Sequence, residues 1–309
     1  KLFSHSSYSR FVCNEFSDQD RRVFFSFFDV SNDQREFFKI DLQYFREIEK
    51  VEGLYLEPTT TLLEGTKNGL RLLAIYYQDK IYTFKDNDWN IVKALVVQAS
   101  SNRMLITDHP RCHFPMDSFV GVSQCLLHHD SIIYKLLLPH FYLQLPLDFA
   151  ALYVSKSMAL NNQSEIYTPL SSTKNGFLNA LRIAFRGLEN NSSFKEYQFR
   201  LAPQKIYGKY GDFLEIYWWA IYQYVNKLIS STEINLDDLK EWSRNLHFMI
   251  PGFPSFEELQ KEDTLARVLT SFIHNVSIEH SADHKSYAGQ SFYKVPLRIR
   301  KNLPHTQDH

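Results

Sequence analysis

Two pairs of histidines, each inside an apolar segment with helical spacing, restrict this chain more than any other feature of its sequence. His109 and His113 lie in "TDHPRCHFPMDSFV", and His280 and His284 lie in "SFIHNVSIEHSADHKSYAGQ". Residues i and i+4 share one face of a helix, so each pair can chelate one ion. Two such helices that face each other give four nitrogens, which suits Fe, Zn, Cu or Mn.

A single pair of this kind is more often a solvated helix face or a hydrogen-bonded pair in the core. Two pairs inside apolar helices favour the metal site, because buried imidazoles need partners. A third pair, His305 and His309, follows Pro304 in a polar tail, where we expect solvent exposure.

Carboxylates lie beside both pairs. Asp117 follows the first pair, and Glu279 and Asp283 flank the second. We expect them to accept the free imidazole N–H and so fix the tautomer and orientation of each ring. The alternative is that one of them bridges two metal ions, which requires it to lie on the same helix face as the histidines.

The pattern along the chain predicts a mostly α domain with a small N-terminal β subdomain. The 25 Phe, 18 Tyr and only 10 Gly suit long helices packed by bulky side chains. Within 70–88, two β-rich runs flank Gln78-Asp79 and predict a hairpin. The stretch 21–30 reads as a strand or buried run, and 38–49 as a strand followed by a helix. We expect one domain over 1–309, with a mixed subdomain 1–88, a helical metal-binding core 89–300 and a tail 301–309.

Capping signals divide the helical part. Asp88 predicts the start of a long helix, and Pro110 predicts a kink or break within it. Further helices are expected at 177–188 and 210–229, from Asn235 or Asp237 to Pro251, and after the capping box of Ser255 and Glu258. The stretch 160–176 reads as a loop.

Charge and composition exclude some functions. A net charge of -1 and a pI of about 6.9 argue against a nucleic-acid partner. Three cysteines are too few for a disulfide scaffold and indicate a reduced, cytoplasmic protein. No signal peptide is apparent, and no run of 18 apolar residues predicts a membrane span.

A series of collinear motifs resembles the lipoxygenase catalytic domain. "DWNIVKALVVQAS" (88–100) is similar to the Trp-x-x-x-Lys helix entry of that family, and "SIIYKLLLPH" (131–140) to its H-P-x-x-K-L-L-x-P-H run. "YGDFLEIYWWAIYQYV" (210–225) resembles the helix that opens D-D-G, and 249–290 resembles the block from G-F-P to Q-H-x-x-x-N-F-G-Q. The motifs cover roughly residues 55–300, and their order and spacing carry the resemblance.

The resemblance implies a ligand set. It places His109, His113 and His280 at the metal, with His284 at a position that is Asn, His or Ser in the family. The family usually has four residues between the first two histidines, on a helix with a local π-type bulge. Here there are three, which a plain α-helix can serve, and the flanking distances favour His109 over Asp108. Gln290, which ends the block, joins Asp117, Glu279 and Asp283 as an outer residue.

Two departures from the family pattern concern the ends of the chain. Lipoxygenases donate the carboxylate of a C-terminal Ile to the iron, whereas this sequence ends "KNLPHTQDH". It also has no room for the family's N-terminal β-sandwich. The resemblance therefore implies a shortened, divergent relative whose fifth ligand is water, a nearby Asp or the tail.

The resemblance also implies a substrate channel. It places "FAALYVSKSMAL" (149–160) at the channel helix and Ala151 near a small residue that steers oxygen, although plain core packing explains this run equally well. Leu136 is a further candidate contact. Arg182 and Arg186 share a helix face and could meet a substrate carboxylate; a solvated face is the more common explanation.

Three hypotheses follow. The first is a non-haem iron oxidoreductase, a dioxygenase or oxygenase of lipid or secondary metabolism, with Mn or Cu as less favoured metals. It would use O₂ on a small apolar or fatty-acid-like substrate, with hydrogen abstraction by a metal-bound oxygen species. The second is a two-metal oxidase or oxygenase that also uses Asp117, Glu279 or Asp283. The third is a metal-free binding module on a degenerate fold.

Overall fold

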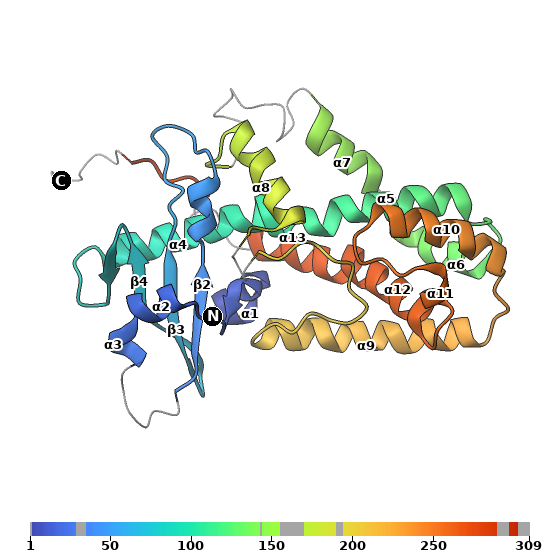
Figure 1. Cartoon of the computed structure of the whole chain (residues 1–309), viewed down its shortest axis with the longest axis horizontal. Helices are drawn as coiled ribbons and strands as arrows, with labels where there is room; N and C mark the ends of the chain where they lie inside the picture. The colour runs from blue at the N-terminus through green and yellow to red at the C-terminus, as the bar shows by residue number, and fades with distance from the viewer. Residues whose placement is uncertain are drawn as a thin grey trace.

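A small antiparallel sheet at one end and a bundle of long helices at the other make up the computed structural model (Figure 1). It describes residues 2–28, 35–142, 144–154, 170–189, 194–288 and 297–301. The sheet order is β1-β2-β3-β4-β5, and the strands are Val12–Cys13, Phe37–Asp41, Thr60–Thr66, Gly69–Tyr77 and Lys80–Tyr82. The mostly α prediction with an N-terminal β part is confirmed.

The helices of the N-terminal part are short. They are α1 (Leu2–His5), the 3-10 helix η1 (Ser7–Phe11), α2 (Asp18–Val23), α3 (Phe25–Phe28) and the 3-10 helix η2 (Gln43–Glu47). Of the two alternatives for 21–30, a strand or a buried run, the strand is wrong, since residues 21–23 belong to α2 and 25–28 to α3. Ser17 begins α2 with a capping box to Asp20, a local signal that outweighs the β propensity of the aromatic run.

The predicted hairpin is confirmed. Tyr77 pairs with Lys80, and Gln78 and Asp79 both take positive φ angles of 48° and 57°. Two successive left-handed residues define the type I′ turn, whose twist matches that of the flanking strands.

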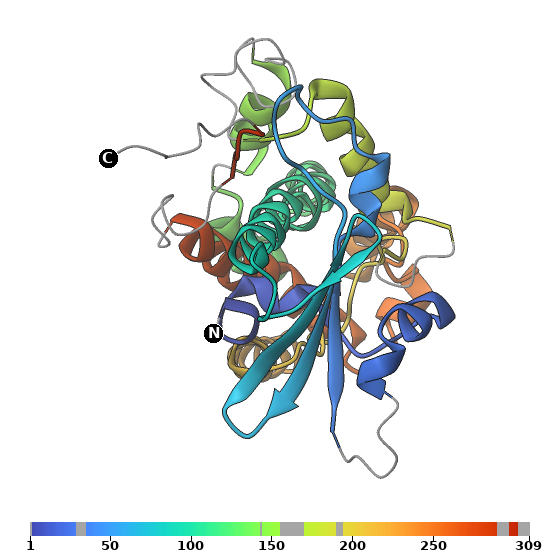
Figure 2. The ribbon, with the colours of Figure 1, turned by 90° about the vertical axis from the view of Figure 1, so that its left-hand side faces the viewer.

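The other long helices pack around a central helical segment, residues 89–126, which Figure 2 shows nearly end-on. The long and short helical elements of this part are α4 (Trp89–Arg103), the π segment η3 (Met104–Asp108), α5 (Pro110–Leu126), α6 (Ile132–Leu137), the 3-10 helix η4 (Leu138–His140), α7 (Gln144–Tyr153), α8 (Lys174–Arg186), α9 (Lys209–Ser230), α10 (Leu236–Met249), α11 (Phe256–Leu259), α12 (Thr264–Ile273), the π segment η5 (His274–Glu279) and α13 (His280–Ala288). Most of the predicted loop at 160–176, together with Gln290, His305 and His309, lies outside the described residues.

Pro110 does not break the helix. A proline ring clashes with the carbonyl four residues earlier in a plain α-helix and lacks an N–H. The chain widens into the π segment η3 directly before Pro110, with His109 N–H bonded to the Met104 carbonyl at 2.8 Å. The segment α4–η3–α5 therefore runs on as one long rod through the molecule (Figure 1).

Two large apolar clusters hold this rod. One joins the sheet to α4, η3 and α8, and the other joins α5 to α10 and α12. Phe119 is fully buried in the second cluster, where it stacks on Phe272 at a centroid distance of 4.0 Å and meets Trp242 edge-on. This contact fixes α5 against α12, the two helices that lead to the histidine pairs.

We predict that Phe119→Ala lowers the free energy of unfolding by about 3–5 kcal/mol, because it leaves a cavity where α5 and α12 meet. Urea denaturation measures the change. Phe248→Ala is the matched control, because Phe248 is 88% exposed on α10 and its loss should cost less than about 0.5 kcal/mol. Equal effects of the two substitutions would contradict this description of the core.

Candidate metal centre

The structure brings the two histidine pairs together. His109 directly follows the π segment η3, His113 lies one turn later on α5, and His280 and His284 lie on α13. Consecutive Nε2 atoms are 3.0 Å apart from His109 to His113, 2.9 Å from His113 to His280, and 3.0 Å from His280 to His284. One ligand atom from each of the four rings lies within 4.8 Å of the others.

Both pairs directly follow a π segment. The His280 N–H bonds to the Asn275 carbonyl, five residues earlier, just as the His109 N–H bonds to the carbonyl of Met104. Each extra residue in a turn rotates the helix that follows, and π segments of this kind recur at functional sites. The spacing of three residues within each pair is served by plain α-helix, as the sequence predicted.

Asp283 orients His109. Its Oδ2 lies 3.2 Å from His109 Nδ1, and its Oδ1 accepts from Arg10 Nη1 at 2.6 Å. Asp283 is fully buried, and the nearby Arg10 guanidinium and His109 hold its pKa below the usual value against the effect of burial. The sequence placed Asp283 beside the second pair, whereas in the fold it contacts the first.

His113 is held by a residue that sequence reasoning missed. Asp148 Oδ1, from α7, lies 2.7 Å from His113 Nδ1, a close contact that is not aligned as a hydrogen bond. Gln144 donates to Asp148 Oδ2 at 3.0 Å and to Asp117 Oδ1 at 3.3 Å. Asp148 is the only acid in the apolar run 144–154, and a lone buried acid signals a specific partner.

Asp117 lies behind Asp148. Burial raises the pKa of both carboxyls, and the side-chain hydrogen bond with Asp148 raises the pKa of Asp117 further, to about 8. Two carboxylates this close cannot both ionise. The sequence expected Asp117 to accept from an imidazole, but α7 places Asp148 in that position.

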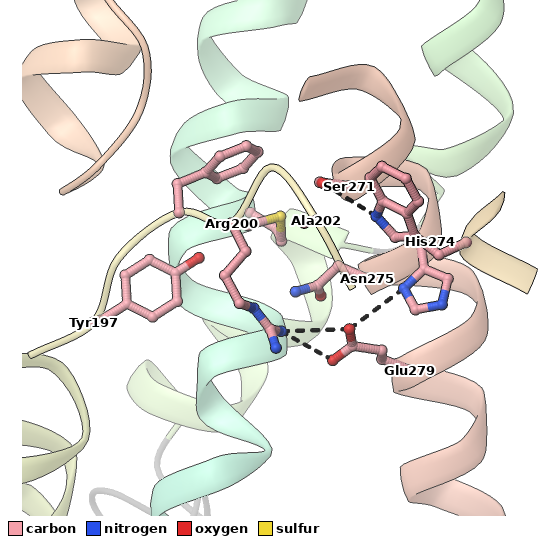
Figure 3. Close-up of a pocket in the computed structure, with 10 residues that line it drawn as sticks. Tyr197, Arg200, Ala202, Ser271, His274, Asn275 and Glu279 are labelled. Carbon is pink, nitrogen blue, oxygen red and sulfur yellow. Dashed lines mark hydrogen bonds and ion pairs between the residues drawn. The ribbon is translucent and has the colours of Figure 1, made fainter. Parts of the chain in front are cut away.

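Glu279 does not reach the four imidazoles. It accepts from Arg10 Nη2 at 3.3 Å and from Arg200 Nη2 at 3.2 Å, and it lies 3.3 Å from His274 Nδ1. Figure 3 shows Arg200 and His274 both pointing to this carboxylate beside a small polar cavity. Arg10 donates to both Glu279 and Asp283, so it connects Glu279 to the carboxylate beside His109.

The remaining candidates lie further away. Asp108 pairs with Arg103 at 3.1 Å, which leaves the ligand position to His109. Ala151 lies on α7, one turn beyond Asp148, and Leu136 packs at the edge of the second apolar cluster. Arg182 and Arg186 are exposed on α8, where Arg182 donates to Asn179.

The ring nitrogens fit a bound cation. Burial, followed by the neighbouring imidazoles, lowers the pKa of His280 to about 3, and burial also lowers the pKa of His109, His113 and His284. Neutral imidazole carries one N–H. When His109 and His113 carry their proton on Nδ1, the two Nε2 lone pairs face each other at 3.0 Å. A cation relieves that repulsion, and donors about 2.1 Å from one ion lie roughly this far apart.

Comparison with known proteins identifies the fold. No protein-family model matches the chain, and no curated protein sequence matches it. A solved structure containing manganese lipoxygenase of Gaeumannomyces graminis (and part of a zonadhesin of Komagataella pastoris) aligns over 100% of this chain and 61% of that chain, with a TM-score of 0.70 and 15% identity.

Two further structures agree. A 9R-lipoxygenase from Cyanothece covers 86% of this chain and 48% of its own, with a TM-score of 0.65 and 14% identity. A second manganese lipoxygenase structure covers 94% and 56%, also with a TM-score of 0.65 and 14% identity. The chain thus has a lipoxygenase-like fold, and it spans less than two-thirds of the length of each of these proteins.

We predict that Asp148→Asn weakens metal affinity by about 10–100-fold, because it removes the charge that contacts His113 Nδ1. Competition with a chelator measures the affinity. Asp117→Asn is the matched control, because an amide at 117 still donates to Asp148 and should change affinity far less. If Asp117→Asn loses the metal and Asp148→Asn retains it, the result would favour a two-metal site that Asp117 bridges.

Proposed function

We propose that this protein is a lipoxygenase-like, metal-dependent oxygenase in which His109, His113, His280 and His284 hold one redox-active ion. The observation that carries the proposal is the cluster of four imidazoles, each with a ligand atom within 4.8 Å of those of the others. The fold supports it, because every solved structure named above is that of a lipoxygenase. Iron is our first candidate metal, and manganese is the second because two of those structures are of manganese enzymes.

A bound iron or manganese ion would supply one-electron chemistry and chemistry with O₂. The protein residues set its surroundings. Asp283 Oδ2 faces the Nδ1 atom of His109, and Asp148 Oδ1 lies 2.7 Å from the Nδ1 atom of His113, so that both carboxylates lie on the outer side of the rings and both Nε2 atoms point inward. These carboxylates also make the imidazoles stronger donors.

The four proposed ligands are all imidazoles, with no carboxylate among them, and the charges of the surrounding carboxylates are largely compensated. Arg10 compensates Asp283, and burial with the hydrogen bond to Asp148 raises the pKa of Asp117 to about 8, which favours a neutral carboxyl near His113. We infer that four neutral imidazoles favour the reduced ion and raise its potential. Oxygenation, desaturation and C–C cleavage of the substrate are therefore all candidate reactions.

The substrate we propose is a small apolar or fatty-acid-like molecule, used together with O₂. Ala151 lies on α7 one turn from Asp148, so α7 borders the histidines, in keeping with a channel there. None of the described helices is long and apolar enough to cross a membrane.

Metal analysis tests the proposal. Protein purified without chelators, or reconstituted anaerobically with Fe(II), should hold about one equivalent of metal per chain. His113→Ala and His280→Ala should each abolish stoichiometric binding, whereas His129→Ala should retain it, because His129 is exposed and stacks on Tyr134. Substoichiometric metal in the unaltered protein would contradict the proposal.

A second assay tests the reaction. With a polyunsaturated fatty acid and O₂, the metal-loaded protein should produce conjugated-diene absorbance, and the His280→Ala variant should not. A loaded protein that consumes O₂ only with a different apolar substrate would overturn the fatty-acid assignment while leaving the metal site in place.

A further inference from the structure

The longest helix, α9, is apolar on both faces. Its inner face packs on α12, where Leu214, Trp218 and Val225 are buried and Trp218 Nε1 donates to Ser271 Oγ. In the sequence, the helical spacing of Tyr217, Trp218, Ile221, Tyr224 and Val225 favours core packing over a cofactor site. The structure divides this set, because Tyr217 and Tyr224 point away from α12 and are 45% and 64% exposed.

The outer face of α9 is a continuous stripe. Its members are Phe213, Ile216, Tyr217, Ala220, Gln223, Tyr224 and Lys227, all of them exposed. In Figure 1 this helix forms one edge of the molecule, and no other helix or strand of the described residues lies beyond it. The apolar side chains of the stripe, with Trp219, expose on the order of 600 Å², the upper end of what monomers show in one patch.

The stripe is symmetric about Ala220. Ile216 and Tyr224 lie four residues before and after it, Tyr217 and Gln223 three, and Phe213 and Lys227 seven. A small residue at the centre lets two helices approach closely. In an antiparallel crossing at Ala220, Ile216 of one copy meets Tyr224 of the other, and large side chains fill the space on both sides.

The antiparallel crossing also brings one pair of opposite charges close together. Asp212 and Glu215 are exposed in the first half of α9, and Lys227 is exposed in the second. An antiparallel pair places Asp212 beside Lys227 of the second copy, whereas a parallel pair places like charges together. Lys209 lies one turn further out, opposite Ser231. A two-fold interface needs such a self-complementary patch.

We propose that the outer face of α9 is the two-fold interface of a homodimer, with Ala220 at the axis. The stripe approaches the roughly 800 Å² that one partner contributes to a standard interface. The proposal is independent of the metal, because it uses no residue of the candidate metal centre.

Sedimentation velocity over a dilution series tests the dimer, for which we expect a dissociation constant in roughly the micromolar range. Ile216→Glu buries a charge at the interface and should weaken dimerisation at least about tenfold. Phe248→Glu, at an 88% exposed site on α10, should leave it unchanged.

Cross-linking tests the axis. In a Cys125→Ser background, Ala220→Cys should give a disulfide-linked dimer on mild oxidation, because residue 220 faces its own copy. Tyr224→Cys should not, since the two copies of residue 224 lie about 12 Å apart along the helices, beyond the reach of a disulfide. Equal cross-linking of both variants would overturn the proposed axis.

A monomer at the highest soluble concentration would overturn the proposal. So would a monomer that cosediments with phosphatidylcholine vesicles and loses this binding in Ile216→Glu, because the stripe would then be a lipid-binding face.

Discussion

The contact between two buried carboxylates and two imidazoles is the constraint on which this site depends. Asp283 and Asp148 approach the outer nitrogens of His109 and His113, and this turns the Nε2 atoms of both rings toward His280 and His284. These carboxylates restrict rotation of the two rings and favour one tautomer of each. Asp283 is 174 residues from His109, so this contact joins two distant segments of the chain at the site.

The negative charge of a buried carboxylate needs a positive charge nearby, and arginines from other parts of the chain provide it. Arg10, in the N-terminal η1, bridges Asp283 and Glu279, and Glu279 also accepts from Arg200. Removing one member of such a network leaves uncompensated charge inside the protein, which is more costly than the pair is stabilising. The N-terminal segment is thereby tied to the helices that carry the histidines.

Local signals predicted much of the fold. The hairpin at Gln78-Asp79, the Asn235 cap and the capping box of Ser255 and Glu258 all depend on neighbours in sequence, and each is present. Asp88 begins its helix without a side-chain cap, and the strand expected in 21–30 failed because the Ser17 box starts a helix there.

The candidate site was predictable only in part. The spacing of each histidine pair follows from the helix repeat, and the lipoxygenase-like order of motifs related the two pairs to each other. Arg10 gave no signal, because its partner Asp283 is 273 residues away and neither residue lies in a motif with the other. Asp148 was visible only as a lone acid in an apolar run. Contacts between distant segments depend on packing, which periodicity does not encode.

The central claim is that the four histidines bind one transition-metal ion. Anomalous diffraction from crystals of protein purified without chelators, recorded on both sides of the iron and manganese absorption edges, tests it most directly. We expect a single anomalous peak about 2.1 Å from the Nε2 atoms. A peak between Asp117 and Asp148, or none at the histidines after reconstitution, would contradict the account.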